Sequence, residues 1–371
     1  MNKTLITADC GQINGRQIAF FAAFVLPIYK LVETPSLLAG FVQGDLLLPA
    51  LAHFLVEATL IFSLLFLLSK SEKSLLERLI DSLGDWVKWV YGALCICFLT
   101  VAVLPLLDLE KFVYAVFYDT APTAFFFAFF FLFAVFFCTK GIRALGRIAD
   151  LSLFLFLIPF LCLIGMSLVE TEFSTLLPFF EKEFGDTMYA MTYTKPHFLD
   201  TILLFPLLMN LRFQKGDGIK IASGYSIGAA ITILFFAVFY GLYSSIAPRE
   251  HYAFAKIAQY YPVLSVVGRI DLLFVYLLCV TLFYYTTLPL QYTVHFLSGI
   301  YPLRTKNVYA VAVCLAALVF TLFCNQYYNS IYAFFGNQLS PIFYLIDFAP
   351  LATFLLLIFE HRARKKEKTY A

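Results

Sequence analysis

The sequence predicts an all-α polytopic membrane protein with about ten transmembrane helices. Hydrophobic residues make up 61% of the 371 residues and charged residues only 13%, whereas a soluble domain averages about 25% charged residues. Apolar runs recur along the whole chain, many of them close to the roughly 20 residues that a helix needs to cross the hydrocarbon core. Since no soluble domain is appended to these runs, we expect residues 1–371 to form a single transmembrane domain.

Ten apolar runs have the length and composition of membrane spans. In chain order they are Gln17–Phe41, Leu48–Leu68, Trp86–Leu107, Ala121–Thr139, Ile148–Val169, Met188–Leu211, Ile221–Ser245, Ile270–Leu290, Val308–Asn325 and Leu339–Phe359. The eighth is the least regular, because apolar sequence continues from Val263 to Tyr301 and Pro289 could kink or divide it. The distribution of Lys and Arg along the chain decides whether this run is one kinked span or two spans.

Basic residues alternate between the two sides of the membrane, and cytoplasmic loops carry an excess of Lys and Arg. The nineteen basic residues of the expected inner segments are Lys3, Arg16, Lys70, Lys73, Arg78, Lys88, Lys140, Arg143, Arg147, Arg212, Lys215, Lys220, Arg304, Lys306, Arg362, Arg364, Lys365, Lys366 and Lys368. The six of the expected outer segments are Lys111, Lys182, Lys195, Arg249, Lys256 and Arg269. Dividing the eighth run would place the basic tail, residues 360–371, outside. We therefore expect ten spans, both termini in the cytoplasm and a basic cytoplasmic tail.

The segment Ser69–Asp85 differs from the spans, because charged and apolar residues alternate in it at helical spacing. Its apolar positions are Leu75, Leu76, Leu79, Ile80 and Leu83. Amphipathic helices of this kind lie in the plane of the membrane interface. We expect this segment along the inner membrane surface.

The first span contains two ionisable residues, Lys30 and Glu33, which are three positions apart and share a helix face. Ionisable residues inside spans are costly and are functional candidates by default. Pro27 and Pro35 bracket them, and a proline removes a backbone donor and clashes with the preceding turn. We expect an interruption here, with Lys30, Glu33, Thr34 and Ser36 as candidate ligand-binding residues.

The sixth span shows a second interruption. Residues 192–197 precede an apolar piece, Phe198–Leu211, that is too short to cross the membrane alone. His197 and Asp200 lie at this joint and Pro206 lies within the apolar piece. We expect two half-helices here, with His197 and Asp200 as further binding candidates.

Interruptions in spans one and six occupy matching positions, five helices apart. Broken helices at corresponding places of two halves indicate an inverted-repeat transporter that binds its solute near the middle of the membrane. The expected halves are helices 1–5, about residues 17–169, and helices 6–10, about 188–359, in a fold of the leucine-transporter type. An alternative stays open, in which the prolines only kink the helices and Lys30 and Glu33 form a structural ion pair.

Other polar residues inside the spans are weaker candidates. Tyr284 and Thr287 give the eighth span a polar centre that could line a pathway, although hydroxyls also simply bond neighbouring helices. His53 and Glu57, four positions apart, fit either a proton-sensitive pair or a structural hydrogen bond. Asp347 in the tenth span fits a proton carrier or a satisfied buried acid.

Signals for covalent chemistry are weak. One GxSxG match, Gly224–Gly228, lies inside the apolar run Ile221–Ser245 and not at the strand-to-helix turn that a nucleophilic serine needs, and the sequence contains no HExxH and no Gly-rich phosphate loop with its Lys. The eight cysteines lie mostly within apolar runs and show no zinc-ligand spacing. We expect no enzymatic activity, no cofactor and no metal site, and the net charge of +2 gives no basic face for nucleic acid.

Several segments together resemble the spore-germination permease family, the membrane-embedded B subunits of nutrient germinant receptors in the amino acid–polyamine–organocation superfamily. They are Gly15–Gln17, Leu26–Leu31, Pro35–Ala39, Asp45, Lys140–Arg147, Leu177-Pro178 and Gly268–Asp271. The family usually has Phe-Gly-Glu entering span six, where this sequence reads Phe198-Leu199-Asp200. It also has a Gly-rich break in span one, which Lys30–Pro35 replaces here. The ligand therefore need not be that of a typical receptor subunit.

The resemblance implies a permease-like receptor subunit in the inner membrane of a spore-forming bacterium. Such a subunit binds, and can transport, a small amino-acid-like solute to trigger germination. The implied partners are the lipid bilayer, a larger membrane subunit and a lipoprotein. Two alternatives stay open: a proton-coupled amino-acid permease acting alone, with Lys30, Glu33 or Asp200 titrating, and a structural membrane subunit without a ligand.

Overall fold

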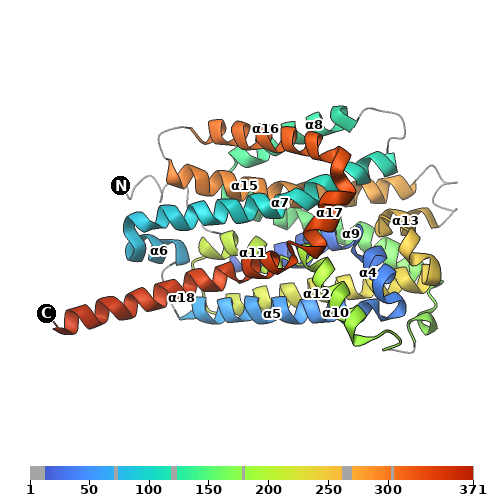
Figure 1. Ribbon diagram of the computed structural model, residues 1–371, viewed down its shortest axis with the longest axis horizontal. Coiled ribbons are helices and arrows are strands. Elements are labelled where there is room, and N and C mark those ends of the chain that lie inside the picture. Colours follow the sequence, from blue (N-terminus) through green and yellow to red (C-terminus); the bar gives the residue numbers. More distant parts are fainter. Residues whose placement is uncertain are drawn as a thin grey trace.

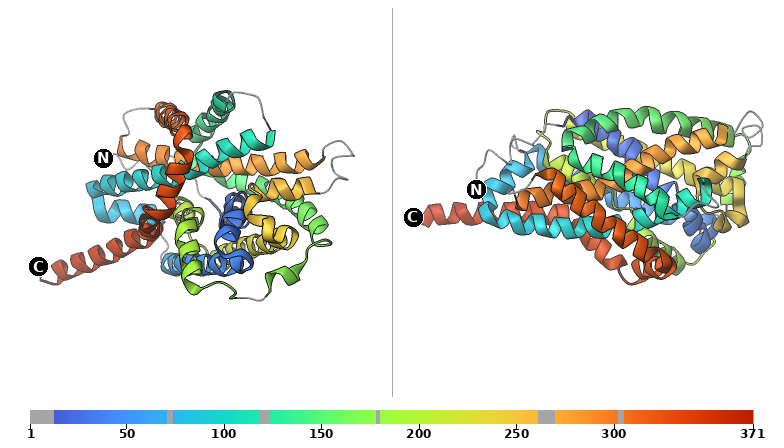
Figure 2. Two further views of the ribbon diagram at one scale, coloured as in Figure 1. Left: turned by 45° about the vertical axis from the view of Figure 1, so that its right-hand side comes forward. Right: turned by 90° about the horizontal axis from the view of Figure 1, so that it is seen from above.

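The computed structural model describes residues 13–70, 74–117, 123–177, 180–260, 270–301 and 305–370, and in these ranges the chain consists almost entirely of helices. The helices form one elongated bundle, from which the C-terminal part of α18 (Ser340–Tyr370) projects (Figure 1, Figure 2). Three positions behind the family resemblance, Pro178, Gly268 and Arg269, lie outside the described residues. The side chains of the basic tail do so too.

Ten span elements are present in the described part of the chain. The eight uninterrupted ones are α5 (Leu47–Ser69), α7 (Val87–Phe117), α8 (Thr123–Thr139), α9 (Ile142–Ser167), α12 (Asp217–Tyr243), α15 (Ile270–Ile300), α16 (Lys306–Cys324) and α18. Six helical stretches are long and apolar enough to cross a membrane, and the described apolar parts of α8 and α18 are shorter. The two remaining elements are the interrupted spans one and six. The prediction of an all-α, polytopic fold of about ten spans is confirmed.

The first span is broken in the middle. It consists of α2 (Gly15–Phe20), a π-helical turn (Phe21–Val25), α3 (Leu26–Lys30) and α4 (Thr34–Val42), with non-helical residues 31–33 between the last two. Pro27 lacks the N–H that a regular turn would use, and the π-helical turn directly precedes it. Pro35 stands in the first turn of α4, where its missing donor costs nothing. The predicted interruption of span one is confirmed.

The sixth span is broken in the same manner. Its two halves are α10 (Phe184–Thr194) and α11 (Asp200–Met209), joined by the single 3₁₀ turn η5 (Lys195–His197). Phe198 and Leu199 are non-helical and buried. The second predicted interruption is therefore confirmed as well.

Two glycines of α12 hold the first span in place. A Cβ atom on Gly224 would lie 2.4 Å from the backbone oxygen of Ala19, and one on Gly228 would lie 2.5 Å from that of Ala22. Only glycine permits this approach of two backbones, the kind of contact on which membrane helices rely for close packing. Span one is fixed against α12 immediately before its break.

Shorter helices complete the bundle. The predicted surface segment forms α6 (Leu75–Leu83), whose Leu75, Leu76 and Leu79 are buried against the spans. Two helices were not expected from the sequence, α13 (Ala253–Tyr260) and α17 (Tyr328–Asn337). The expected end of the eighth span at Leu290 was also wrong, because α15 continues to Ile300 with Pro289 inside it.

Candidate functional site

A buried ion pair joins the two interruptions. Lys30 Nζ, at the end of α3, lies 2.5 Å from Asp200 Oδ1, at the start of α11, and both side chains are 1% exposed. Lys30 also donates to the backbone oxygen of Leu26, and the Tyr225 hydroxyl of α12 donates to Asp200 Oδ2. The ammonium group lies 5.5 Å from the ring centroid of Phe198. The structure thus brings together one candidate residue from each broken helix.

Glu33 faces away from this pair. Its Oε2 atom accepts a hydrogen bond from Tyr328 at 3.3 Å, and its Oε1 atom lies 3.5 Å from Nδ1 of His251. The alternative of a Lys30–Glu33 ion pair was therefore wrong, because Lys30 is already paired with Asp200. His251 lies outside the spans, and its hydrogen bond to Glu33 raises the pKa of this imidazole.

The remaining candidates of the first break lie at the start of α4. The Ser36 hydroxyl donates to the backbone oxygen of Glu33 at 2.8 Å, and Thr34 is buried, its Oγ1 without a hydrogen-bond partner among the described residues. The break also frees the carbonyl of Val32, which accepts from the backbone N–H of Ala253 at 2.7 Å. Helix α13 thus satisfies a backbone group that would otherwise be unpaired at membrane depth.

Carboxylates and tyrosines cluster beside α3. Asp108 of α7 accepts hydrogen bonds from the hydroxyls of Tyr29 at 2.5 Å and Tyr328 at 2.9 Å. Glu110, two residues further along α7 and therefore on the opposite face of this helix, accepts from the side chain of Asn325 at 2.7 Å. Both carboxylates are buried. Asp108 and the two tyrosines thus place a carboxyl group and aromatic rings next to the broken first span.

His197 of η5 belongs to the same aromatic group. Its Nε2 atom lies 2.9 Å from the hydroxyl of Tyr332. Tyr29 stacks between His197 and Tyr285, with 5.2 Å between ring centroids on each side. The imidazole, from the second interruption, therefore lies against α3 of the first.

A second buried ionic cluster lies on the other side of η5. Lys195 Nζ lies 2.7 Å from Glu57 Oε1 of α5 and 2.7 Å from Asp347 Oδ2 of α18, and it also donates to the backbone oxygen of Phe198 at 2.8 Å. All three ionisable side chains are at most 1% exposed. The assignment of Lys195 to an outer segment was wrong, since two acids and a free carbonyl hold its ammonium group inside the bundle.

His53 does not form the proposed pair with Glu57. Its ring stacks on Phe198 with centroids 4.3 Å apart, and its Nε2 atom lies 3.3 Å from Oγ1 of Thr194. Glu57 instead uses Oε2 to accept from the backbone N–H and the hydroxyl of Thr201. Glu57 and His53 thus contact η5 and its neighbours separately.

Tyr284 and Thr287 lie apart from the joint, by which we mean the place where the Lys30–Asp200 pair brings the two broken spans together. The Tyr284 hydroxyl donates to the backbone oxygen of Leu145 in α9, and Thr287 donates to the backbone oxygen of Tyr284 within α15. The neighbouring Tyr285 is the residue of α15 that stacks against Tyr29. Two adjacent residues of α15 therefore make different contacts. The hydroxyl of Tyr284 bonds α9, and the ring of Tyr285 packs against Tyr29 of α3.

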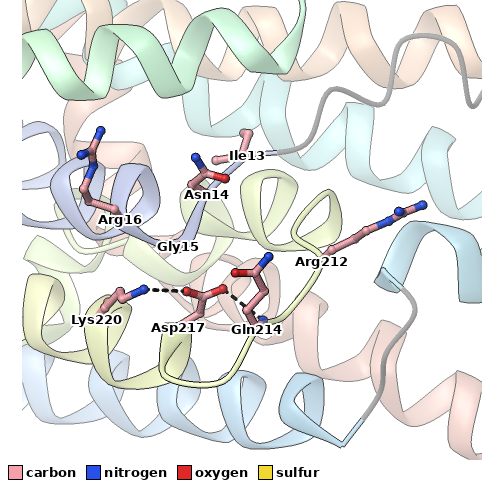
Figure 3. Close-up of a pocket in the computed structure, with 8 residues that line it drawn as sticks. All are labelled: Ile13, Asn14, Gly15, Arg16, Arg212, Gln214, Asp217 and Lys220. Atoms are coloured by element: carbon pink, nitrogen blue, oxygen red, sulfur yellow. Dashed lines mark hydrogen bonds and ion pairs between the residues drawn. The ribbon is translucent and has the colours of Figure 1, made fainter.

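A pocket of about 380 Å³ opens at one end of the bundle, where α2 begins and α11 ends (Figure 3). Its lining residues are Ile13, Asn14, Gly15, Arg16, Arg212, Gln214, Asp217 and Lys220. Figure 3 shows Lys220 and the backbone of Gln214 both turned toward Asp217. The basic side chains here belong to the expected inner segments.

Lys195 and Asp108 are functional candidates that reasoning from the sequence missed. Lys195 stands inside an interrupted span, directly before Pro196, so the rule applied to Lys30 would have selected it. Asp108 lies one residue beyond the expected end of span three, where acids are common and carry little information. Tyr225 gave no signal, because a tyrosine in the middle of an apolar helix is ordinary.

The joint offers an ammonium group, a carboxylate and aromatic rings at the same depth. A molecule that carries both an amine and a carboxylate matches this set, because each of its charges would find an opposite charge. Among the described residues, no group of three or more His, Cys, Asp or Glu side chains is placed to hold a metal ion.

Comparison with known proteins agrees with this architecture. Residues 50–330 match the model of a family described as "Spore germination protein". A search of curated proteins finds no match. Among solved structures, crystal structures of two mutants of the Eremococcus coleocola manganese transporter superpose with TM-scores of 0.54 and 0.52, at 14% sequence identity over 96% of this chain and 77% of the other. This likeness establishes the fold, an inverted repeat of five plus five helices of the leucine-transporter type.

Proposed function

The chain belongs to the spore germination protein family, and from this premise we propose that it is a permease-like subunit of a nutrient germinant receptor. It binds a small amino-acid-like solute at the joint of the two broken helices. Binding shifts the equilibrium between two conformations by the difference in affinity for them. The shift opens a pathway for the solute or signals to partner subunits, and germination follows.

The observation that carries this proposal is the ion pair of Lys30 and Asp200, 2.5 Å apart and 1% exposed. Separating two buried charges is unfavourable unless each gains a new partner. A zwitterionic solute provides both, because its carboxylate can pair with Lys30 and its ammonium group with Asp200. The net charge of the joint stays the same, while α3 and α11 move apart to admit the solute.

The groups around the pair support an amine-bearing solute. Asp108 and Glu33, which both contact the hydroxyl of Tyr328, give the adjoining cluster an acidic character. The stacked rings of Tyr29 and His197 lie between this cluster and the joint. Carboxylates and aromatic faces both attract ammonium groups.

The site residues that we propose are Lys30, Glu33, Thr34, Ser36, His197 and Asp200, with Tyr284 and Thr287 of α15 as pathway residues. The proposed location is the inner membrane of a spore-forming bacterium, with both termini in the cytoplasm. The positive-inside bias of the sequence supports this orientation. The proposed partners are a larger membrane subunit and a lipoprotein.

A direct binding screen tests the proposal. The full chain in lipid nanodiscs is titrated with amino acids, and nucleosides and sugars serve as comparison compounds. We expect an amino acid to bind wild type and to lose at least tenfold in affinity in the Lys30→Met and Asp200→Asn variants. The Asp150→Asn variant is the matched control, since Asp150 forms an exposed ion pair with Arg16 far from the joint. Equal affinity in all variants would refute the site.

A permease acting alone is the second candidate, and the structural neighbours named as manganese transporters favour it, because their fold moves a solute. Manganese itself fits this joint poorly, since the ammonium group of Lys30 already provides a positive charge there. Uptake of radiolabelled amino acid into proteoliposomes that contain only this chain would support the permease. Binding without net uptake would support the receptor subunit.

A further inference from the structure

The cluster of Lys195, Glu57 and Asp347 contains two acidic groups and only one basic group. One ammonium group faces two carboxyl groups, which also lie close enough to interact with each other. The nearest other buried ammonium group, that of Lys30, is paired with Asp200. Two ionised carboxylates would therefore leave one uncompensated negative charge at a fully buried place, which is strongly unfavourable.

The hydrogen bonds distinguish the two acids. Glu57 accepts three hydrogen bonds, one at Oε1 from Lys195 and two at Oε2 from the N–H and the hydroxyl of Thr201. Asp347 accepts from Lys195 through Oδ2 only, and its buried Oδ1 has no partner in the described part of the chain. A proton on Glu57 would weaken three hydrogen bonds that the charge of its carboxylate strengthens, whereas a proton on Asp347 Oδ1 would weaken only one.

We propose that Asp347 is a proton-binding site. Its carboxyl group holds one exchangeable proton at neutral pH, while Glu57 stays ionised and Lys195 stays charged. Two acids that share one site behave in this way, since like charges in contact cannot both ionise. The ligand class of the site is the proton, and the proposal does not depend on which solute binds at the Lys30–Asp200 pair.

Other groups around Asp347 do not supply the missing charge. The titratable residues that interact with it or with its two partners are His53 of α5, Asp200 of α11, Tyr225 of α12, Tyr285 of α15 and Tyr344 of α18 itself. None of them adds a permanent positive charge. Arg78 of α6 lies over Phe354, roughly two turns further along α18. Helices α10 and α17 contribute Tyr193 and Tyr332 to the neighbouring aromatic group.

The site is connected to the break in span six through Lys195. This residue also binds the backbone oxygen of Phe198, a carbonyl that the interruption leaves free of helical bonding. Loss of the proton from Asp347 would add a negative charge beside η5 and favour a conformation in which water or a cation reaches the joint. A proton bound to Asp347 therefore stabilises the arrangement in which Lys30 and Asp200 are paired.

Infrared spectroscopy of the purified full chain tests the proposal without any solute. A protonated carboxyl group has a C=O stretching band apart from those of amides and carboxylates, and the band shifts in D₂O. We expect the spectrum of wild type minus Asp347→Asn at neutral pH to contain this band at the intensity of one carboxyl group. The Asp150→Asn variant, at a partly exposed acid that is paired with Arg16, should leave the band unchanged.

A second variant keeps the test decisive if Asp347→Asn does not fold. In Glu57→Gln the Lys195 ammonium group faces a single acid, so Asp347 ionises and the same band disappears although Asp347 is present. The proposal is overturned if the wild-type minus Asp347→Asn spectrum contains only carboxylate bands. It is equally overturned if Glu57→Gln keeps the full intensity of the protonated band.

Discussion

Lys30 Nζ and Asp200 Oδ1 lie 2.5 Å apart although 170 residues separate them in the chain. Each ends or begins a half-helix at an interruption, so the contact ties the two broken spans together at their weakest points. The backbone beside each partner is not part of a continuous helix, since Lys30 ends α3 and Asp200 begins α11. Under the proposed function, this pair is the contact that a bound solute separates.

Single substitutions of this pair should destabilise the protein more than the double substitution. Lys30→Met or Asp200→Asn alone leaves one buried charge without its partner, which typically costs about 3–5 kcal/mol. Lys30→Met combined with Asp200→Asn removes both charges and should recover most of the loss. Thermal unfolding in detergent, followed by circular dichroism, measures the three variants. A double variant that is as unstable as the sum of the two single ones would contradict the pairing.

The contact of α12 with span one predicts that alanine substitutions at Gly224 and Gly165 change the stability in opposite directions. Gly224→Ala places a methyl group 2.4 Å from the backbone oxygen of Ala19, and overpacking of this kind costs about 1–3 kcal/mol. Gly165→Ala in α9 meets no atom within 4 Å and should gain up to about 1 kcal/mol from helix propensity. Melting temperatures of the two variants test this. Equal effects would mean that the contact with span one does not limit the packing.

Much of the fold was predictable because each signal is local. The length of the apolar runs and the alternation of basic residues gave ten spans, and Pro27, Pro35 and Pro196 marked the two breaks. Helices α13 and α17 were not predictable in the same way, since eight and ten residues are too short to stand out beside the spans. Pro289 shows the limit of the proline rule, because neighbouring helices can satisfy the backbone that a proline frees.

The partners within the site were not predictable, although several of its residues were. Lys30 and Asp200 stood out as charges in apolar surroundings, but nothing local says that they meet. Lys195 contacts acids 138 and 152 residues away in the chain, and only the folded arrangement brings α5, η5 and α18 together. The sequence of a single chain does not say which of its distant residues come into contact in the fold.

The carboxylate of Asp45 holds the loop that follows α9, so we expect its substitution to loosen this loop. Its two carboxylate oxygens accept from the backbone N–H groups of Phe180 at 2.7 Å and Lys182 at 2.9 Å, and the side chain is 1% exposed. Asp45→Asn replaces one acceptor by a donor, so one of these N–H groups loses its partner. We expect faster cleavage of this loop in limited proteolysis, by about fivefold or more if about 1 kcal/mol is lost. Asp150→Asn, at a partly exposed acid near the other end of α9, should be cleaved at the wild-type rate.

The pairing of His251 with Glu33 predicts a pH-dependent contribution to stability. The hydrogen bond to Glu33 raises the pKa of the His251 imidazole above its ordinary value of about 6.5. A group that binds its proton more tightly when folded stabilises the protein fully below the unfolded pKa, and the contribution is lost as the pH rises through the folded pKa. The melting temperature of wild type should therefore fall over this window relative to that of His251→Asn. Glu33→Gln should remove the same pH-dependent difference, because the imidazole then faces a neutral amide and no longer a negatively charged carboxylate. The contribution is small, since the His251 side chain is 57% exposed and solvent screens the interaction. A difference between wild type and His251→Asn that grows with rising pH would contradict the assignment.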